Sequence, residues 1–232
     1  MVSTADPWTA NGYVVADDAC RLGAVRVRLL GEDAAGDWAA GQGAAAAGAQ
    51  RARGILGWSL RGIASADLDG LPTRVSDAPE PAPAPAHPNG VVAIDHVVAI
   101  SPAFERSVAA LREAGLDLRR VREEPTPAGA PRQAFFRLGH EILELVAEPE
   151  EVVARGGRAG GPARFWGLAL LSEDLERTVA AFAPHVSEIR AAVQPGRRIA
   201  TVRREAGLGV PLALMSVGER GPRAQAEREA VT

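Results

Sequence analysis

The sequence contains no lysine: all 26 of its basic residues are arginine. A chain without lysine has no amine for Schiff-base chemistry, which excludes pyridoxal-type catalysis and the lysine of a phosphate-binding loop. The single cysteine, Cys20, excludes an intrachain disulfide, a CxxC redox pair and a cysteine-based zinc site. The formal net charge of −3 gives no electrostatic reason to expect nucleic acid as a partner.

Long apolar runs are also missing, since no stretch approaches the roughly 20 residues needed to span a bilayer. Residues 1–20 have neither the basic start nor the apolar core of a signal peptide. The sequence therefore predicts a cytoplasmic protein with no membrane partner. Its 232 residues are 47% hydrophobic, an ordinary fraction for a soluble globular chain.

An internal repeat is the most informative feature that is present. The run at residues 94–101 returns 71 residues later at 165–172, and the match continues between residues 105–110 and 176–181. A repeat of this length indicates a duplicated structural unit. The two copies differ in their chemistry, because the first has His96 where the second has Gly167.

The chain divides at a proline-rich segment, in which alternate prolines remove backbone donors and force extended geometry. Before it, we expect an accessory β region that forms a hairpin from strands at 24–30 and 55–63, with a mobile Gly/Ala-rich loop at 34–53. After it, we expect two modules and a polar tail that frays. The predicted divisions are an accessory region 1–76, a linker 77–90, a tandem domain 91–217 with modules 91–150 and 163–217, and a tail 218–232.

The sequence pattern of each module predicts the order β-α-β-β-β. A β-branched run is followed by apolar residues at helical spacing and then by shorter extended segments. Ser101 and Ser172 are the expected helix N-caps, and Gly115 and Pro184 the expected helix ends. The remaining predicted strands are 91–100, 118–122, 133–138 and 141–147 in the first module, and 186–190, 199–203 and 210–216 in the second.

Two such units in tandem resemble the vicinal oxygen chelate superfamily, which contains glyoxalase I, methylmalonyl-CoA epimerase, extradiol dioxygenases and bleomycin-resistance proteins. The residues that carry the resemblance are the opening strand at 94–98 and the closing segment at 136–145. The resemblance implies an α+β fold in which two tandem βαβββ modules form a cupped mixed sheet around a pocket, with the helices outside. It also implies that each unit of an enzyme offers one metal ligand from its first strand and one from its fourth.

Carried over onto this sequence, His96 and Glu144 match the metal ligands of the first unit. The second unit has Gly167 and Ala213 at these positions, and neither side chain has a donor atom. Since two protein ligands hold a transition metal weakly, we expect no cofactor, and the alternative is a divalent metal on His96 and Glu144. The favoured interpretation is a buried His96–Glu144 pair, or a direct ligand contact, without metal.

Strand alternation predicts which side chains face the pocket. The result is a cup with apolar walls and a few polar groups, the profile of a small-molecule site. Arg137 and Arg203 would either extend to solvent, as arginines near strand ends mostly do, or hold an acid group of the ligand. Small residues would make room for the ligand. Trp166 is expected in the core under a helix, and the alternative is a ligand platform. The predicted ligand-binding residues are His96, Gln133, Phe135, Arg137, Glu144, Gly167, Thr201, Arg203, Ala213 and Met215.

Two functions remain open at this point. The first, favoured by the two vacant ligand positions, is a metal-free protein of the bleomycin-resistance type that binds an apolar or aromatic small molecule. The second is an enzyme, a lyase, isomerase or dioxygenase, in which His96 and Glu144 hold a divalent metal and Glu144 also moves a proton. A third interpretation is that the N-terminal hairpin and the tandem modules serve assembly and not ligand binding. A homodimer is left open. No catalytic residue is assigned.

Overall fold

The computed structural model of this chain describes residues 1, 3–31, 54–126 and 129–218. Its centre is an eight-stranded mixed sheet in the order β11-β12-β13-β10-β6-β9-β8-β7. The two central strands, β6 (Val91–Ser101) and β10 (Arg164–Ser172), run antiparallel and open the two copies of the repeat. The predicted α+β fold class is confirmed.

The same order of elements occurs twice around these central strands, and each closing strand returns to lie parallel to the opening one. After β6 the first copy has α3 (Phe104–Glu113), β7 (Asp117–Arg122), β8 (Gln133–Arg137) and β9 (Ile142–Ala147). The short helix α4 (Glu150–Arg155) leads to β10. The second copy continues with α5 (Leu175–Phe182), β11 (Arg190–Ala191), β12 (Arg198–Val202), the 3₁₀ turn η2 (Arg204–Ala206) and β13 (Leu212–Ser216).

A buried pair of hydroxyl groups joins strand and helix at the same place in both copies. The Oγ atoms of Ser101 and Ser107 lie 2.6 Å apart, and Ser172 Oγ lies 2.7 Å from Thr178 Oγ1. The predicted N-caps at Ser101 and Ser172 are wrong, because α3 begins at Phe104 and α5 at Leu175, with Ala103 and Asp174 at their N-cap positions. Helix α5 is capped instead by Asp174, whose carboxylate accepts from the Arg177 backbone N–H at 2.9 Å.

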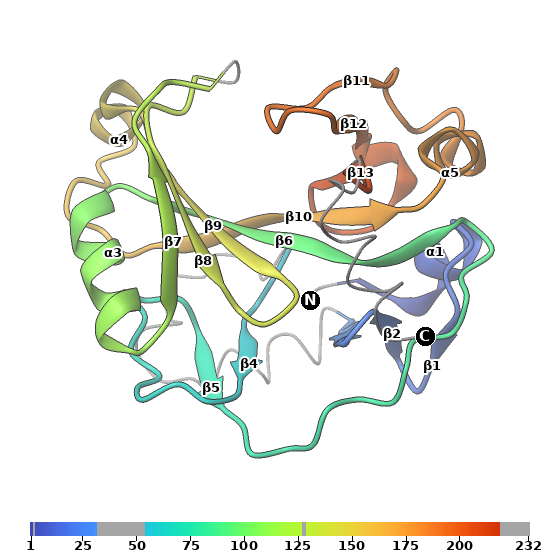
Figure 1. Cartoon of the computed structure of the whole chain (residues 1–232), viewed down its shortest axis with the longest axis horizontal. Coiled ribbons are helices and arrows are strands. Elements are labelled where there is room, and N and C mark those ends of the chain that lie inside the picture. The colour runs from blue at the N-terminus through green and yellow to red at the C-terminus, as the bar shows by residue number, and fades with distance from the viewer. Residues whose placement is uncertain (2, 32–53, 127–128, 219–232) are drawn as a thin grey trace, which may run out of the picture.

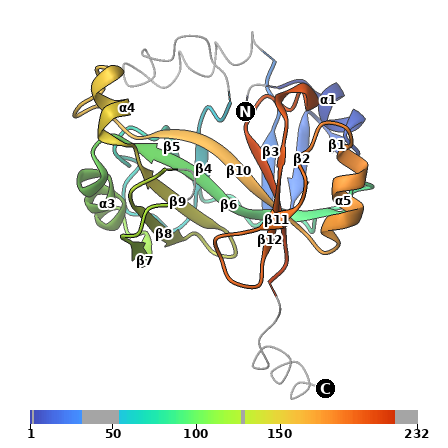
Figure 2. The same ribbon diagram turned by 90° about the horizontal axis from the view of Figure 1, so that it is seen from above.

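The helices cover one face of the sheet. Figure 1 shows the outer strands of the two copies on opposite sides of β6 and β10, and Figure 2 shows α3 and α5 at opposite ends of the molecule. We call the covered side the helix face, because Phe136 and Leu143 pack there against Leu111 of α3, and Leu214 packs against Phe182 of α5. The opposite side is called the site face.

The N-terminal elements also pack on the helix face, below the sheet in Figure 1. Trp8 and Leu22 join the core of the second copy, whereas Leu68 and Leu71 join that of the first. The elements are α1 (Ala5–Ala10), β1 (Val15–Ala16), β2 (Ala19–Leu22), β3 (Val25–Arg28), β4 (Trp58–Leu60) and β5 (Thr73–Val75). The predicted pairing of strands 24–30 and 55–63 is wrong, since β3 pairs with β2, and β4 pairs in parallel with β5.

The proline-rich segment is fixed to β2 through His87 and through Arg21, whose Nη1 donates to the Ala82 carbonyl oxygen at 3.1 Å. His87 is 5% exposed, and its Nδ1 accepts from the Val14 backbone N–H at 3.0 Å while its Nε2 lies 2.8 Å from the Arg21 carbonyl oxygen. Burial raises the pKa of the neighbouring Cys20 thiol to about 12.

The structure does not test two further groups of predictions. The division into domains stays a prediction, and the predicted loop at 34–53 and tail beyond residue 218 lie outside the described residues. Among the helices that the structure describes, none has the length and apolar character to cross a membrane.

Candidate functional site

A β-bulge in the central strand β6 brings two consecutive side chains together. His96 lies opposite Ala169 of β10 and Ile94 lies opposite Leu170, so that Asp95 is an extra residue between them. A bulge breaks the alternation of side chains along a strand. As a result Asp95 Oδ2 lies 2.8 Å from His96 Nδ1, although consecutive residues of a regular strand would point to opposite faces.

The two side chains belong to a row of hydrogen-bonded groups that links both copies of the repeat. His96 Nε2 lies 3.1 Å from Glu144 Oε2, and Gln133 donates to the other oxygen of Glu144. On the other side, Arg197 donates to both oxygens of Asp95, at 2.7 and 3.2 Å, and to the Ser216 carbonyl oxygen at 3.0 Å. We call Arg197, Asp95, His96, Glu144 and Gln133 the polar row.

Charges alternate along the polar row, and this alternation sets the protonation of its members. Burial on its own would lower the pKa of His96, but hydrogen bonds to Asp95 and Glu144 and the charges of both outweigh it and raise this pKa to about 9. Burial on its own would raise the pKa of Asp95, but His96 and Arg197 together lower this pKa to about 2. At neutral pH His96 is therefore an imidazolium between two carboxylates, with only 12% of its side chain exposed.

These residues fit a metal ion poorly. A metal needs the lone pair of a neutral imidazole, and both ring nitrogens of His96 already lie within hydrogen-bond distance of carboxylate oxygens, at 2.8 and 3.1 Å. In the described part of the chain, no group of three or more His, Cys, Asp or Glu side chains is placed to hold a metal. At the ligand positions of the superfamily pattern this chain supplies one imidazole and one carboxylate. Protein sites for transition metals usually have three or four protein ligands.

The second copy has a matching bulge with different residues. Phe165 pairs with Ala99 and Gly167 with Val98, so that Trp166 is the extra residue, 71 positions after Asp95. Trp166 is 53% exposed, and the prediction that it lies in the core is wrong. The bulge is the physical reason, because it shifts the alternation from which that prediction was made.

Gly167 is buried against backbone and not against open space. A Cβ atom at this position would lie 2.6 Å from the Pro211 carbonyl oxygen and 3.2 Å from Pro211 Cβ. The packing of Pro211 thus explains a glycine here without a ligand, which differs from the interpretation that Gly167 makes room for one.

We expect Gly167→Ala to lower the free energy of unfolding by about 1 to 3 kcal/mol, because the added methyl group meets a backbone atom that cannot rotate away. Gly31→Ala is the matched control, since a Cβ there has no atom within 4 Å. Urea unfolding followed by circular dichroism measures both. An unchanged midpoint in Gly167→Ala would mean that Pro211 yields and that space at this position is available.

The other predicted ligand-binding residues fall into two groups on the sheet. Gln133 and Glu144 belong to the polar row, and Phe135 lies opposite Glu144 in the register of β8 and β9. Ala213 lies opposite Thr201 in β13 and β12, in the second copy. Met215 is only 1% exposed, so it presents no surface to a ligand in this structure.

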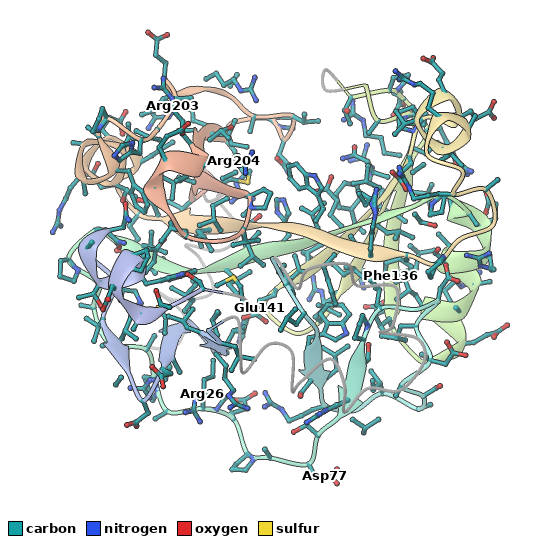
Figure 3. All side chains as sticks on the ribbon, turned by 180° about the vertical axis from the view of Figure 1, so that it is seen from behind. Arg26, Asp77, Phe136, Glu141, Arg203 and Arg204 are labelled. Carbon is teal, nitrogen blue, oxygen red and sulfur yellow. The ribbon has the colours of Figure 1, made fainter. Side chains whose placement is uncertain are left out.

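The two arginines expected to hold an acid group do not join the polar row. Both Arg137 and Arg203 are exposed, and Arg203 Nη1 donates to the Pro184 carbonyl oxygen at 3.4 Å. Figure 3 shows Arg203 beside Arg204 in the second copy, whereas Phe136 lies in the sheet of the first. Arg203 lines an open groove of about 380 Å³, whose other residues are Ser187, Glu188, Ile189, Arg190 and Thr201.

Sequence reasoning missed three residues of this site: Asp95, Arg197 and Trp166. Asp95 stood in the motif that carried the family resemblance, but no role was predicted for it. Arg197 is 102 residues away from Asp95 in the chain, and its pairing has no local signal. The offset of 71 between Asp95 and Trp166 was the available clue, because a duplicated unit repeats its irregularities as well as its strands.

Fold and site together define a protein of two similar βαβββ units that share one sheet, with a charged row on the face away from the helices. No model of a known protein family matches the sequence, and no curated protein matches it. Methylmalonyl-CoA epimerases are among the similar solved structures. One is 16% identical, with a TM-score of 0.46, over 56% of this chain and 97% of the epimerase.

The enzyme from Mycobacterium tuberculosis is 20% identical, with a TM-score of 0.45, over 59% of this chain and 93% of its own. A variant from Streptomyces coelicolor, in complex with 2-nitronate-propionyl-CoA, is 20% identical with a TM-score of 0.44, over 56% of this chain and 99% of its own. Similarity at these identities and scores assigns no activity or ligand to this chain.

Proposed function

We propose that this protein binds a small organic molecule on its site face beside Glu144, without a resident metal, as a bleomycin-resistance-type protein does. The observation that carries the proposal is the position of His96, whose two ring nitrogens lie 2.8 and 3.1 Å from the carboxylate oxygens of Asp95 and Glu144. A protonated imidazole that is held by a carboxylate at each ring nitrogen supports a fixed polar anchor and opposes metal ligation. Gly167 and Ala213 add no donor atom from the second copy.

Glu144 is the group on which a ligand would be oriented. Each of its oxygens accepts one hydrogen bond, from His96 and from Gln133, whereas a carboxylate has about four acceptor sites. Its neighbours in register are the apolar residues Val98 and Phe135. A fixed acceptor among apolar side chains orients a small molecule that donates a hydrogen bond.

An acid group on the ligand belongs to this proposal as its second part. Arg190 and Arg203 line the same groove as the hydroxyl groups of Ser187 and Thr201. Guanidinium and hydroxyl groups donate to carboxylates and phosphates, and this supports the groove as the place for such a group. A cytoplasmic location and a homodimer stay predictions of the sequence.

The metal-free part of the proposal is tested by elemental analysis. Protein purified without a metal-affinity tag is expected to hold far less than one equivalent of zinc, iron, manganese or nickel after dialysis. We also expect Mn²⁺ at about 100 μM to leave the melting temperature unchanged, whereas a site with a dissociation constant of about 1 μM would add about 2.7 kcal/mol of stability.

His96→Ala is the control in both measurements. We expect the substitution not to reduce the metal content of the protein. One equivalent of metal that disappears in His96→Ala would overturn the proposal. It would favour the second function, a metal-dependent lyase, isomerase or dioxygenase that uses His96 and Glu144.

A further inference from the structure

Trp166 is a large apolar side chain that is exposed near the start of β10, one of the two central strands of the sheet. It is 53% exposed, although its neighbours Leu168 and Leu170 in β10 are buried. A single exposed apolar side chain is ordinary on a protein surface, but an indole offers a large flat apolar area that a ligand can cover. The bulge lies near the start of β10, where the strand pairs with β6, whereas its pairing with β13 begins at Leu168.

The neighbours of Trp166 place its indole on the site face. Phe165 packs against Trp58 with ring centroids 5.0 Å apart, on the helix face with the N-terminal elements. Before the bulge the alternation holds, so Arg164 points the other way, and it donates to Glu148 at 2.7 Å, beside α4. The matching bulge in the first copy likewise turns Asp95 toward the polar row.

The register relates Trp166 to Glu144. Gly167, next to Trp166, lies opposite Val98 of β6, and Val98 lies beside Glu144 of β9. Neighbouring strands are about 4.8 Å apart, so the indole and the carboxylate start about 10 Å from each other on one face. Val98 lies between them and is apolar, and Phe135 lies beyond Glu144.

We propose that Trp166 is a stacking platform for a planar aromatic ligand of two or three fused rings, whose hydrogen-bond donor reaches Glu144. This inference rests on the proposed function and names the ligand class for that site. Three observations select a small aromatic occupant: the exposed indole at the bulge, the apolar residue between it and Glu144, and the unused acceptor sites of that carboxylate. An amino-substituted ring system supplies both a stacking face and a donor.

Proflavine, a planar aminoacridine, is the probe for the test, with binding followed by its own fluorescence and by the indole N–H signals of the four tryptophans in ¹⁵N spectra. We expect the Trp166 signal to shift on binding. Trp166→Ala should weaken proflavine binding roughly tenfold or more, whereas Trp166→Phe keeps a ring and should stay within about threefold of the unmodified protein. Val193→Ala is the control, since Val193 is also an exposed apolar residue, at 51%.

Equal affinity of Trp166→Ala and the unmodified protein would overturn the inference, and so would a change of oligomeric state in Trp166→Ala without an effect on proflavine. The proposed function has a separate readout in the amide signals of Val98 and Phe135 on addition of non-aromatic fragments. If these amides respond to such fragments while proflavine does not bind, the site stands and the aromatic ligand class fails. If no compound of either kind moves them, both fail.

Discussion

Asp95→Asn is expected to lower the free energy of unfolding by about 3 kcal/mol. The substitution keeps the size of the side chain and removes its charge, which leaves Arg197 without its carboxylate and His96 with one carboxylate in place of two. Removing one member of a buried ion pair costs about 3 to 5 kcal/mol, because the remaining charge stays away from water. The side chain of Asp95 is 18% exposed, which places the expected loss at the lower end.

Asp117→Asn is the matched control for this measurement. Asp117 also pairs with an arginine, Arg119, at 3.2 Å, but its side chain is 54% exposed. Exposed pairs of this kind contribute between about 0 and 1 kcal/mol. Urea unfolding at pH 6 measures both variants, and equal small losses would mean that the polar row is held by the sheet and adds little stability of its own.

The fold could be predicted because its signals are local or periodic. The offset of 71 residues identified two copies, and strand and helix patterns within each copy gave their order. The buried hydroxyl pairs Ser101–Ser107 and Ser172–Thr178 show how closely the copies agree. The N-terminal elements were harder, because β1 has two residues and β5 has three, too few for a period-two pattern to stand out.

The site was predicted only in part, for a physical reason that can be named. His96 and Glu144 meet as expected, because they lie in two paired strands. Trp166 was assigned to the wrong face and Asp95 was given no role, since one extra residue in a strand inverts the alternation that follows it. Arg197 reaches Asp95 across the boundary between the copies, and no pattern along the chain encodes such a pairing.

The polar row also makes stability depend on pH in the alkaline range. The pKa of His96 is raised in the folded protein, to about 9 from 6.5, so the stability that it contributes is complete below pH 6.5 and is lost as the pH rises through 9. We expect the unmodified protein to lose on the order of 3 kcal/mol relative to His96→Gln between pH 6 and pH 10. Asp95, whose pKa is lowered to about 2, stays ionised throughout this range.

Imidazole ¹⁵N spectra observe the same titration directly and distinguish the two functions. At pH 7.5 both nitrogens of His96 should carry protons, with a midpoint near pH 9 that falls in Asp95→Asn, because one of the two stabilising carboxylates is then neutral. A midpoint at or below pH 7 in the unmodified protein would contradict this. A neutral imidazole would have a lone pair available at neutral pH, and the metal-dependent function would then gain the ligand that it needs.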